Sequence, residues 1–505
     1  MHTSAHKIPL IHTTIARRLV ATALLSVLVP AVALLQGCSN TLLSSVASTT
    51  KSPTVTLSPS STSVTIWQTQ SFTVSGISDT STCTWQNTPS TTLVSLGGGS
   101  YQAVALGTEQ ITVTCGTATA TAIVAVVAQE VSGPITISKG GTYSGNWNST
   151  DPNTPAVTIH TDDAVILHDS TITGRGRLID VSGVKNGANV TIQNVTGTAL
   201  DPQAIGMQRG AFVYATNFTS LTVKNCSMYG VSFGVSVAGA KPTQLSILNN
   251  FGSNLEDRAS DGNGGLTATR PSNGHFVILN DITAASGAEV AWNQLVQTIG
   301  QSSTEDPINI YESQGTSAHP IWVHDNYLEG FSSPASSAYT GTGILTDGSS
   351  TKHATAFTLA QANQIVHTAG SGVAVASGHD NTFSSNRVVS CGVDSSGLLY
   401  AGPNSFGAVI WDYTNSGPVY FYNNTISGTS GGLIRSLNAT PSIADYWLPS
   451  VGGIYSSDSS TDNDFTDPCF VNGTIQLQAE DSERAYWKSK LAANDELIGD
   501  QHAAS

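Results

Sequence analysis

Short runs of alternating apolar and polar residues recur along most of the chain and predict an all-β protein. Between residues 53 and 128 these runs are close together, and turn residues separate them. They include TVTL at 54–57, VTI at 64–66, SFTV at 71–74 and QITVT at 110–114. This spacing is typical of a β-sandwich domain.

From about residue 134 two other phrases recur. One is a pair of alternating apolar residues that ends on Asn, as in VTIQN at 190–194, LTVKN at 221–225, IWVHDN at 321–326 and VYFYNN at 419–424. The other is Gly followed by a short β run, as in GVSV at 234–237, GLTA at 265–268, GILT at 343–346, GVAV at 372–375 and GAVI at 407–410. Interleaved phrases that return every few tens of residues predict a solenoid whose coils stack strand on strand. Asn at a fixed turn can pair with the Asn above and below it, and it tolerates left-handed backbone.

This repeat resembles the right-handed parallel β-helix superfamily, the pectate-lyase-like architecture, over residues 134–475. The resemblance implies the fold but not one activity, because the fold carries many. Residues 476–505 are expected to form a C-terminal cap or tail, with a charged, helix-prone stretch from Glu480 to Leu497 that covers the last coil.

The first 37 residues read as a signal peptide. Arg17 and Arg18 precede an uncharged, mostly apolar stretch from Leu19 to Leu35, and LQGC follows at 35–38. This ending resembles the lipobox of bacterial lipoproteins. The resemblance implies cleavage before Cys38, a lipid on its thiol, and a place on the bacterial outer membrane or cell surface. Residues 38–52, rich in Ser and Thr, are then a flexible tether.

The domain at 53–128 resembles the bacterial Ig-like group-2 domain. The resemblance rests on CTW at 83–85, VSL at 94–96 and ALGTEQITV at 105–113. In such a domain Cys83 and Cys115 would sit on neighbouring strands and form a disulfide, outside the cytoplasm where disulfides persist. Three cysteines then remain as expected free, buried thiols: Cys226, Cys391 and Cys469.

The net charge of the chain limits the classes of partner that it is expected to bind. Only 10% of residues are charged, the net charge is −15, and after removal of the leader it is 16 − 34 = −18. No basic stretch follows the leader, so nucleic acid is not an expected partner. We expect a monomer that meets the membrane only through its lipid anchor.

Stacking the Gly-led phrases predicts a functional face. We aligned them on the inward residues Leu266, Ile308, Ile344, Val373 and Ala408, which places a row of outward positions at the strand ends. The row holds three carboxylates, two aromatic rings and an arginine: Glu312, Asp347, Asp412, Tyr311, Trp411 and Arg270.

These side chains suggest chemistry on a polysaccharide. Coils about 4.8 Å apart would put Glu312 about 5 Å from Asp347, and Asp347 about 10 Å from Asp412, near the carboxyl separations that glycosidases use. We therefore predict Glu312, Asp347 and Asp412 as catalytic. The predicted substrate-binding residues are Arg270, Asn309, Tyr311 and Trp411, because aromatic rings stack on the apolar faces of sugars and Arg270 can pair with a uronate.

Several alternatives stay open at this stage. A hydrolase is preferred over a lyase, because an acidic face repels a polyuronate unless a cation bridges it. A non-catalytic surface adhesin or structural β-helix fits the anchor and spacer equally well, and polar residues belong in turns anyway. No histidines have metal-ligand spacing, so no metal site is predicted. The carboxylates could hold Ca²⁺.

Overall fold

The computed structural model describes residues 54–500, except 67, 299–301, 331–340, 350–353, 369, 392–406, 438–439, 444–445, 448–454, 464–469, 472–473 and 476–477. The leader, Cys38, the tether and Cys469 therefore lie outside the described residues. Within them, no helix is long and apolar enough to cross a membrane.

The first part of the described chain forms small β-sheets around their own core. Their strands are β1 (Thr56–Ser58), β2 (Ser61–Thr65), β3 (Thr69–Ser71), β4 (Thr73–Ser75), β5 (Thr84–Thr88), β6 (Leu93–Gly97), β7 (Ser100–Ala103), β8 (Gly107–Cys115) and β9 (Ala118–Val127). They pair as β1-β4, β2-β9-β8-β5 and β3-β7-β6. β5 and β8 are antiparallel, and a disulfide joins Cys83 to Cys115 beside them.

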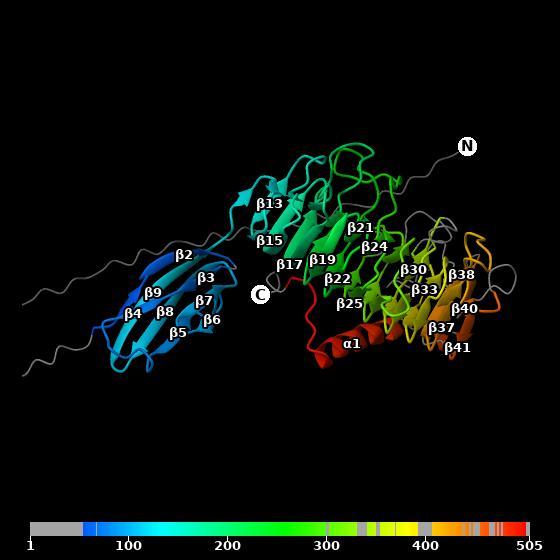
Figure 1. The fold of residues 1–505 in the computed structure, drawn as a ribbon. Coiled ribbons are helices and arrows are strands. Elements are labelled where there is room, and N and C mark those ends of the chain that lie inside the picture. Colours follow the sequence, from blue (N-terminus) through cyan, green and yellow to red (C-terminus); the bar gives the residue numbers. More distant parts are fainter. Residues whose placement is uncertain are drawn as a thin grey trace, which may run out of the picture. The chain divides into compact units, whose positions relative to one another are not determined.

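From Val131 to Thr461 the described strands form a right-handed parallel β-helix (Figure 1). One sheet, called the front sheet here, contains eleven strands in chain order. They are β11 (Ile135–Ile137), β14 (Val157–Ile159), β16 (Ile179–Val181), β18 (Val213–Thr216), β21 (Val235–Ala240), β24 (Val277–Ile282), β27 (Ile308–Tyr311), β30 (Ile344–Asp347), β33 (Val373–Val375), β36 (Ala408–Ile410) and β40 (Tyr446–Trp447).

The other strands run along the remaining sides of each coil and join into a sheet of 21 strands. They are β10 (Val131–Ser132), β12 (Gly141–Tyr143), β13 (Asn146–Ser149), β15 (Ala164–Gly174), β17 (Ala188–Ala199), β19 (Phe218–Lys224), β20 (Ser227–Tyr229), β22 (Gln244–Leu248), β23 (Phe251–Ser253), β25 (Ala288–Ala291), β26 (Gln294–Val296), β28 (Ile321–His324), β29 (Tyr327–Glu329), β31 (Thr358–Gln361), β32 (Gln364–Val366), β34 (Thr382–Ser384), β35 (Arg387–Ser390), β37 (Thr425–Ser427), β38 (Ser430–Leu437), β39 (Thr440–Ile443) and β41 (Ser459–Thr461). A short antiparallel pair follows, β42 (Phe470–Val471) with β43 (Thr474–Ile475).

The register of the front sheet confirms four of the five aligned phrases and corrects the first. Ile308 pairs with Ile344, Ile344 with Val373, and Val373 with Ala408. The partner of Ile308 on the preceding strand is Val277, not Leu266. The phrase at 265–268 lies in an excursion between β23 and β24, because it forms only an isolated bridge from Ser260 to Leu266.

Asparagines stack at the bends between the remaining sides, as the repeat predicts. We call Asn250, Asn293, Asn326, Asn363 and Asn386 the Asn ladder, and each of its side chains is fully buried. Each carboxamide from Asn250 to Asn363 donates to the Oδ1 of the next, at 2.9 Å. The residue before each ladder position, rather than the ladder Asn itself, has the left-handed backbone, including Trp292 and Ala362.

The C-terminal helix α1 (Gln478–Ala493) lies along the flank of the β-helix rather than over its last coil (Figure 1). Trp487 stacks on Tyr327 with ring centroids 5.5 Å apart, and Lys490 Nζ is 2.6 Å from Asp325 Oδ1. Beyond the helix, Asp500 accepts a hydrogen bond from Thr196. The tail therefore covers several coils.

The expectation of free thiols holds for one cysteine and is wrong for another. Cys226 is free and fully buried, and its backbone N–H donates to Asn250 at the start of the Asn ladder. Cys391 is disulfide-bonded. The β-helix therefore contains a covalent link that the sequence pattern did not suggest.

Candidate functional site

A pocket of about 190 Å³ opens on the outer face of the front sheet, and we call it the acid pocket. The pocket is lined by residues in β30, β33 and β36 and by residues just before or after β27, β30, β33 and β36. They are Glu305, Asp306, Thr342, Leu345, Asp347, Gly370, Ser371, Ala374, Ala376, Val409, Trp411 and Tyr413. Leu345, Ala374 and Val409 are partners in the strand register, so they form a small apolar floor. Carboxyl groups and aromatic rings border that floor.

Asp347 ends β30 at one border of the pocket. Its Oδ1 accepts a hydrogen bond from Gly348 N at 2.7 Å, and Asn309 Nδ2 is 3.5 Å from its Oδ2. Burial raises the pKa of Asp347, and the charge of Glu312 raises it further. Asp347 therefore keeps its proton to a higher pH than an ordinary aspartate.

Tyr311 and Glu312 stand beside Asp347 on the neighbouring coil. Tyr311 pairs with Asp347 in the strand register, and the Glu312 carboxylate accepts hydrogen bonds from the Ser349 hydroxyl at 2.6 Å and the Ser349 N–H at 3.0 Å. The sequence prediction thus placed the Glu312–Asp347 pair on adjacent coils correctly. The two carboxyl groups have different surroundings, since one is desolvated and the other is held by a hydroxyl and an amide.

Two aromatic rings follow β36 on the same border. Trp411 and Tyr413 both line the pocket, with ring centroids 5.3 Å apart and planes at 85°. The two rings are therefore packed edge to face at this border of the pocket.

Asp412 lies between these rings in sequence, but its carboxylate accepts hydrogen bonds from the turn that follows it. It is fully buried, and it accepts hydrogen bonds from Ser416 N, Ser416 Oγ and Gly417 N, each at 2.9 Å, and from Tyr455 Oη at 3.1 Å. It does not line the acid pocket. The structure therefore brings Asp347 and Trp411 to one pocket and leaves Asp412 outside it.

Arg270 lies in the excursion between β23 and β24, not in the predicted strand row, and it does not line the acid pocket. Its Nε and a terminal nitrogen are 2.9 and 2.8 Å from Asp257 Oδ2. Its charge still acts on Glu305, because it opposes the rise in the pKa of Glu305 that burial causes.

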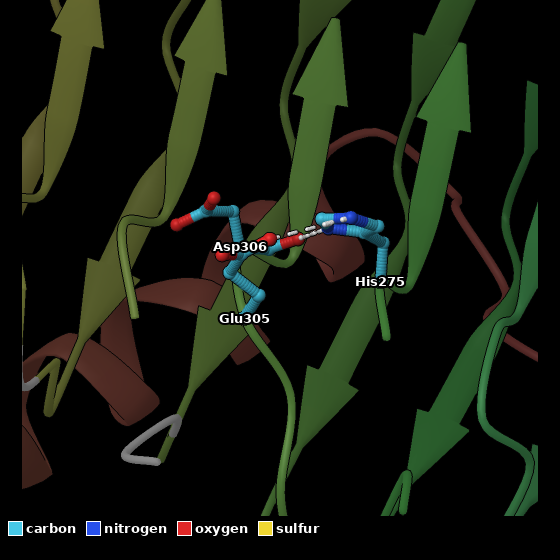
Figure 2. Close-up of side chains that lie close together, drawn as sticks. All are labelled: His275, Glu305 and Asp306. Carbon is cyan, nitrogen blue, oxygen red and sulfur yellow. Dashed lines mark hydrogen bonds and ion pairs between the residues drawn. The ribbon is translucent and has the colours of Figure 1, made fainter. Parts of the chain in front are cut away.

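Glu305 and Asp306, which line the pocket at the strand starts, form a cluster with His275 (Figure 2). None of the three was among the site residues predicted from the sequence. His275 precedes β24, and Glu305 and Asp306 precede β27, so the two segments are neighbours at the strand starts. Burial raises the pKa of Asp306 well above its usual value, and the charge of Glu305 adds to the effect. Burial also lowers the pKa of His275 to about 4. The signal was present, because Glu305 and Asp306 open the most acidic run that enters a strand, but our alignment looked only at strand ends.

Comparison with known proteins adds a distant likeness. No protein-family model and no curated protein matches the sequence. Two crystal structures of the periplasmic alginate epimerase AlgG, one of them a double mutant, align with 12% and 11% identity. They cover 65% and 64% of this chain and 78% of the epimerase chain, with TM-scores of 0.24 and 0.25. At such TM-scores the likeness supports no conclusion about the site.

Proposed function

We propose that this protein binds a polysaccharide in the acid pocket and cleaves it, with Asp347 as the general acid. The observation that carries the proposal is a desolvated carboxyl whose pKa is raised, beside a second carboxylate and next to an aromatic pair. A carboxyl that keeps its proton can protonate the glycosidic oxygen as the bond breaks.

Glu312 takes the second role in this proposal. Two carboxyls in unlike surroundings are the usual basis for dividing acid and base work, and Glu312 already accepts two hydrogen bonds on the coil next to Asp347. Trp411 would stack on a sugar ring that lies over the apolar floor. Asn309 would position Asp347 through the contact between its Nδ2 and Asp347 Oδ2. We favour hydrolysis over elimination, because all the charged side chains that line the pocket are acidic and would repel a polyuronate.

The test is a panel of neutral and uronate polysaccharides, assayed for new reducing ends and for the absorbance of unsaturated uronates. We expect reducing ends without that absorbance. Asp347→Asn should lower the rate about 10²–10⁴-fold, while Asp462→Asn, a change of an exposed acid on β41's following turn, should not. Absorbance that persists in the Asp347 variant would favour a lyase instead.

The adhesive alternative has its own signature in the same panel. It is supported if no polysaccharide is cleaved, while one is bound and the binding is lost in Trp411→Ala. Such a result would keep the pocket as a ligand site and remove the chemistry.

We further propose that Cys38 carries a lipid and that the Ig-like domain is a spacer between this anchor and the β-helix. The support is LQGC at 35–38 and the separate hydrophobic cores of the two described domains. Cells fed a palmitate analogue should label the protein, and Cys38→Ser should abolish the label. Labelling that survives the substitution would refute the anchor, and with it the outer-membrane location.

A further inference from the structure

The side chains of His275, Glu305 and Asp306 lie close enough together to share one metal ion. One ligand atom from each residue lies within 4.8 Å of the others, and His275 Nε2 is 3.8 Å from Glu305 Oε2. That distance is too long for a hydrogen bond. It suits two ligands of one ion, because bonds of about 2.1 Å place ligand atoms about 3–4 Å apart. In Figure 2 the Glu305 side chain and the backbone of Asp306 both reach toward the His275 ring.

The tautomer of His275 is set by its other nitrogen. Nδ1 lies 2.7 Å from the backbone oxygen of Asp306, and a carbonyl oxygen only accepts, so Nδ1 carries the proton and donates it. Nε2 then holds a lone pair. The ring is almost fully buried, and Nε2 makes no hydrogen bond to any described residue. Histidines that bind metals commonly have this arrangement, with the second nitrogen donating to a carbonyl.

His324, which also lies near carboxylates, differs from His275 in its hydrogen bonds. Both nitrogens of His324 lie within hydrogen-bond distance of carboxylates, at 2.7 Å from Asp325 and 3.1 Å from Glu289. His324 is therefore satisfied by its neighbours. His275 has only one such partner and points its other nitrogen at a carboxylate beyond hydrogen-bonding reach.

The charge around the cluster also lacks compensation. Asp257, Asp306 and Asp347 each act electrostatically with Glu305, and Arg270 is the only cation that does so among the described residues. Four carboxylates against one guanidinium leave 1 − 4 = −3 when all are ionised. A divalent cation would offset most of this charge at a site that is largely, though not fully, removed from water.

We propose that His275, Glu305 and Asp306 bind a divalent transition-metal ion, of which Zn²⁺ is the natural probe. An imidazole ligand favours such an ion over Ca²⁺ or Mg²⁺, which take oxygen ligands. Binding would turn the Asp306 carboxylate inward and draw Glu305 toward Nε2. Because Glu305 and Asp306 also line the acid pocket, the remaining coordination positions would face the pocket.

The test is calorimetric titration of the purified full chain with Zn²⁺, and separately with Ca²⁺, after treatment with chelator. No polysaccharide is added, so the result does not depend on the proposed function. We expect tighter binding of Zn²⁺ than of Ca²⁺, and a Zn²⁺ affinity at least about 10-fold weaker in Glu305→Gln. Glu289→Gln is the matched control, since it changes the acid beside the satisfied His324 and should leave the affinity unchanged.

A crystal soaked in Zn²⁺ locates the ion independently. An anomalous peak about 2.1 Å from His275 Nε2 is the expected result. A peak only at other histidines, equal affinity in wild type and Glu305→Gln, or no binding would each overturn the proposal. His275→Gln serves as a second variant, and if it fails to fold, Glu305 still decides the question because its side chain is partly exposed.

Discussion

The Asn ladder and the acid pocket both withdraw polar side chains from water, and they differ in how those side chains are partnered. In the ladder each buried amide finds another amide and a backbone carbonyl, as Asn326 does with Asn363 and Val290. In the pocket the Asp347 carboxylate has few partners, and in the neighbouring cluster His275 Nε2 has no hydrogen bond among the described residues. Buried polar groups that are fully satisfied hold a structure together, whereas those left short of partners mark sites where something binds or reacts.

The same contrast separates two aspartates near one sheet edge. Asp412 is saturated by its own turn, while Asp347 borders a pocket. Asp412 and Asp347 are the same residue type and both stand at or just after the end of a front-sheet strand. Only their hydrogen-bond partners distinguish the structural carboxylate from the candidate acid.

The largest stability loss should come from breaking the ladder at its middle. Asn326→Ala removes the amide that donates to Asn363 and to the backbone, and it removes one of the two acceptors of the Asn293 amide. We expect the free energy of unfolding to fall by about 3–5 kcal/mol, because several buried groups lose partners together. Thermal or urea unfolding of the β-helix measures this. Asn494→Ala, at an exposed Asn with one bond to Lys490, should cost less than about 1 kcal/mol.

A smaller loss is expected at Asp412. Asp412→Asn puts an NH₂ group where two oxygens now accept N–H and O–H donors, so it should cost about 1–3 kcal/mol of stability. The melting temperature reports the change. A variant as stable as the wild type would mean that the turn does not need this carboxylate.

The smallest effect is a pH dependence at Asp306. Its pKa is raised in the folded protein, so its ionisation weakens the fold as pH rises from the unfolded value near 3.8 through the folded one. Asp306→Asn keeps an acceptor for Thr342 N and removes the charge. In chelator the variant should match the wild type within about 0.5 kcal/mol near pH 4 and exceed it at pH 8. An advantage that is equal at both pH values would contradict this assignment.

Repetition made the fold readable from the sequence. Period-two alternation and recurrent Asn are local signals, and four front strands pair in the register that the aligned phrases predict. The alignment used Leu266 in place of Val277, because the excursion between β23 and β24 contains a sequence like the Gly-led phrase. A further error concerned Cys391, since pairing between distant cysteines depends on the packed coils.

The site was only partly readable. Asp347 and Trp411 follow from strand-end positions, whereas His275 and Glu305 meet through strand starts that the alignment did not compare. The burial of Asp412 depends on a turn that folds back onto it, and hydrogen bonds of that kind have no periodic signature in the sequence.

The most direct test compares Asp347→Asn with Asp412→Asn on a polysaccharide that the wild type cleaves. Rates should be taken per folded molecule, with the folded fraction from circular dichroism at the assay temperature. The account predicts a loss of about 10²–10⁴-fold for Asp347→Asn without loss of stability, and a near wild-type rate with lower stability for Asp412→Asn. Equal rates in the two variants, or a larger loss at Asp412, would contradict the claim that the acid pocket at Asp347 is the site of the chemistry.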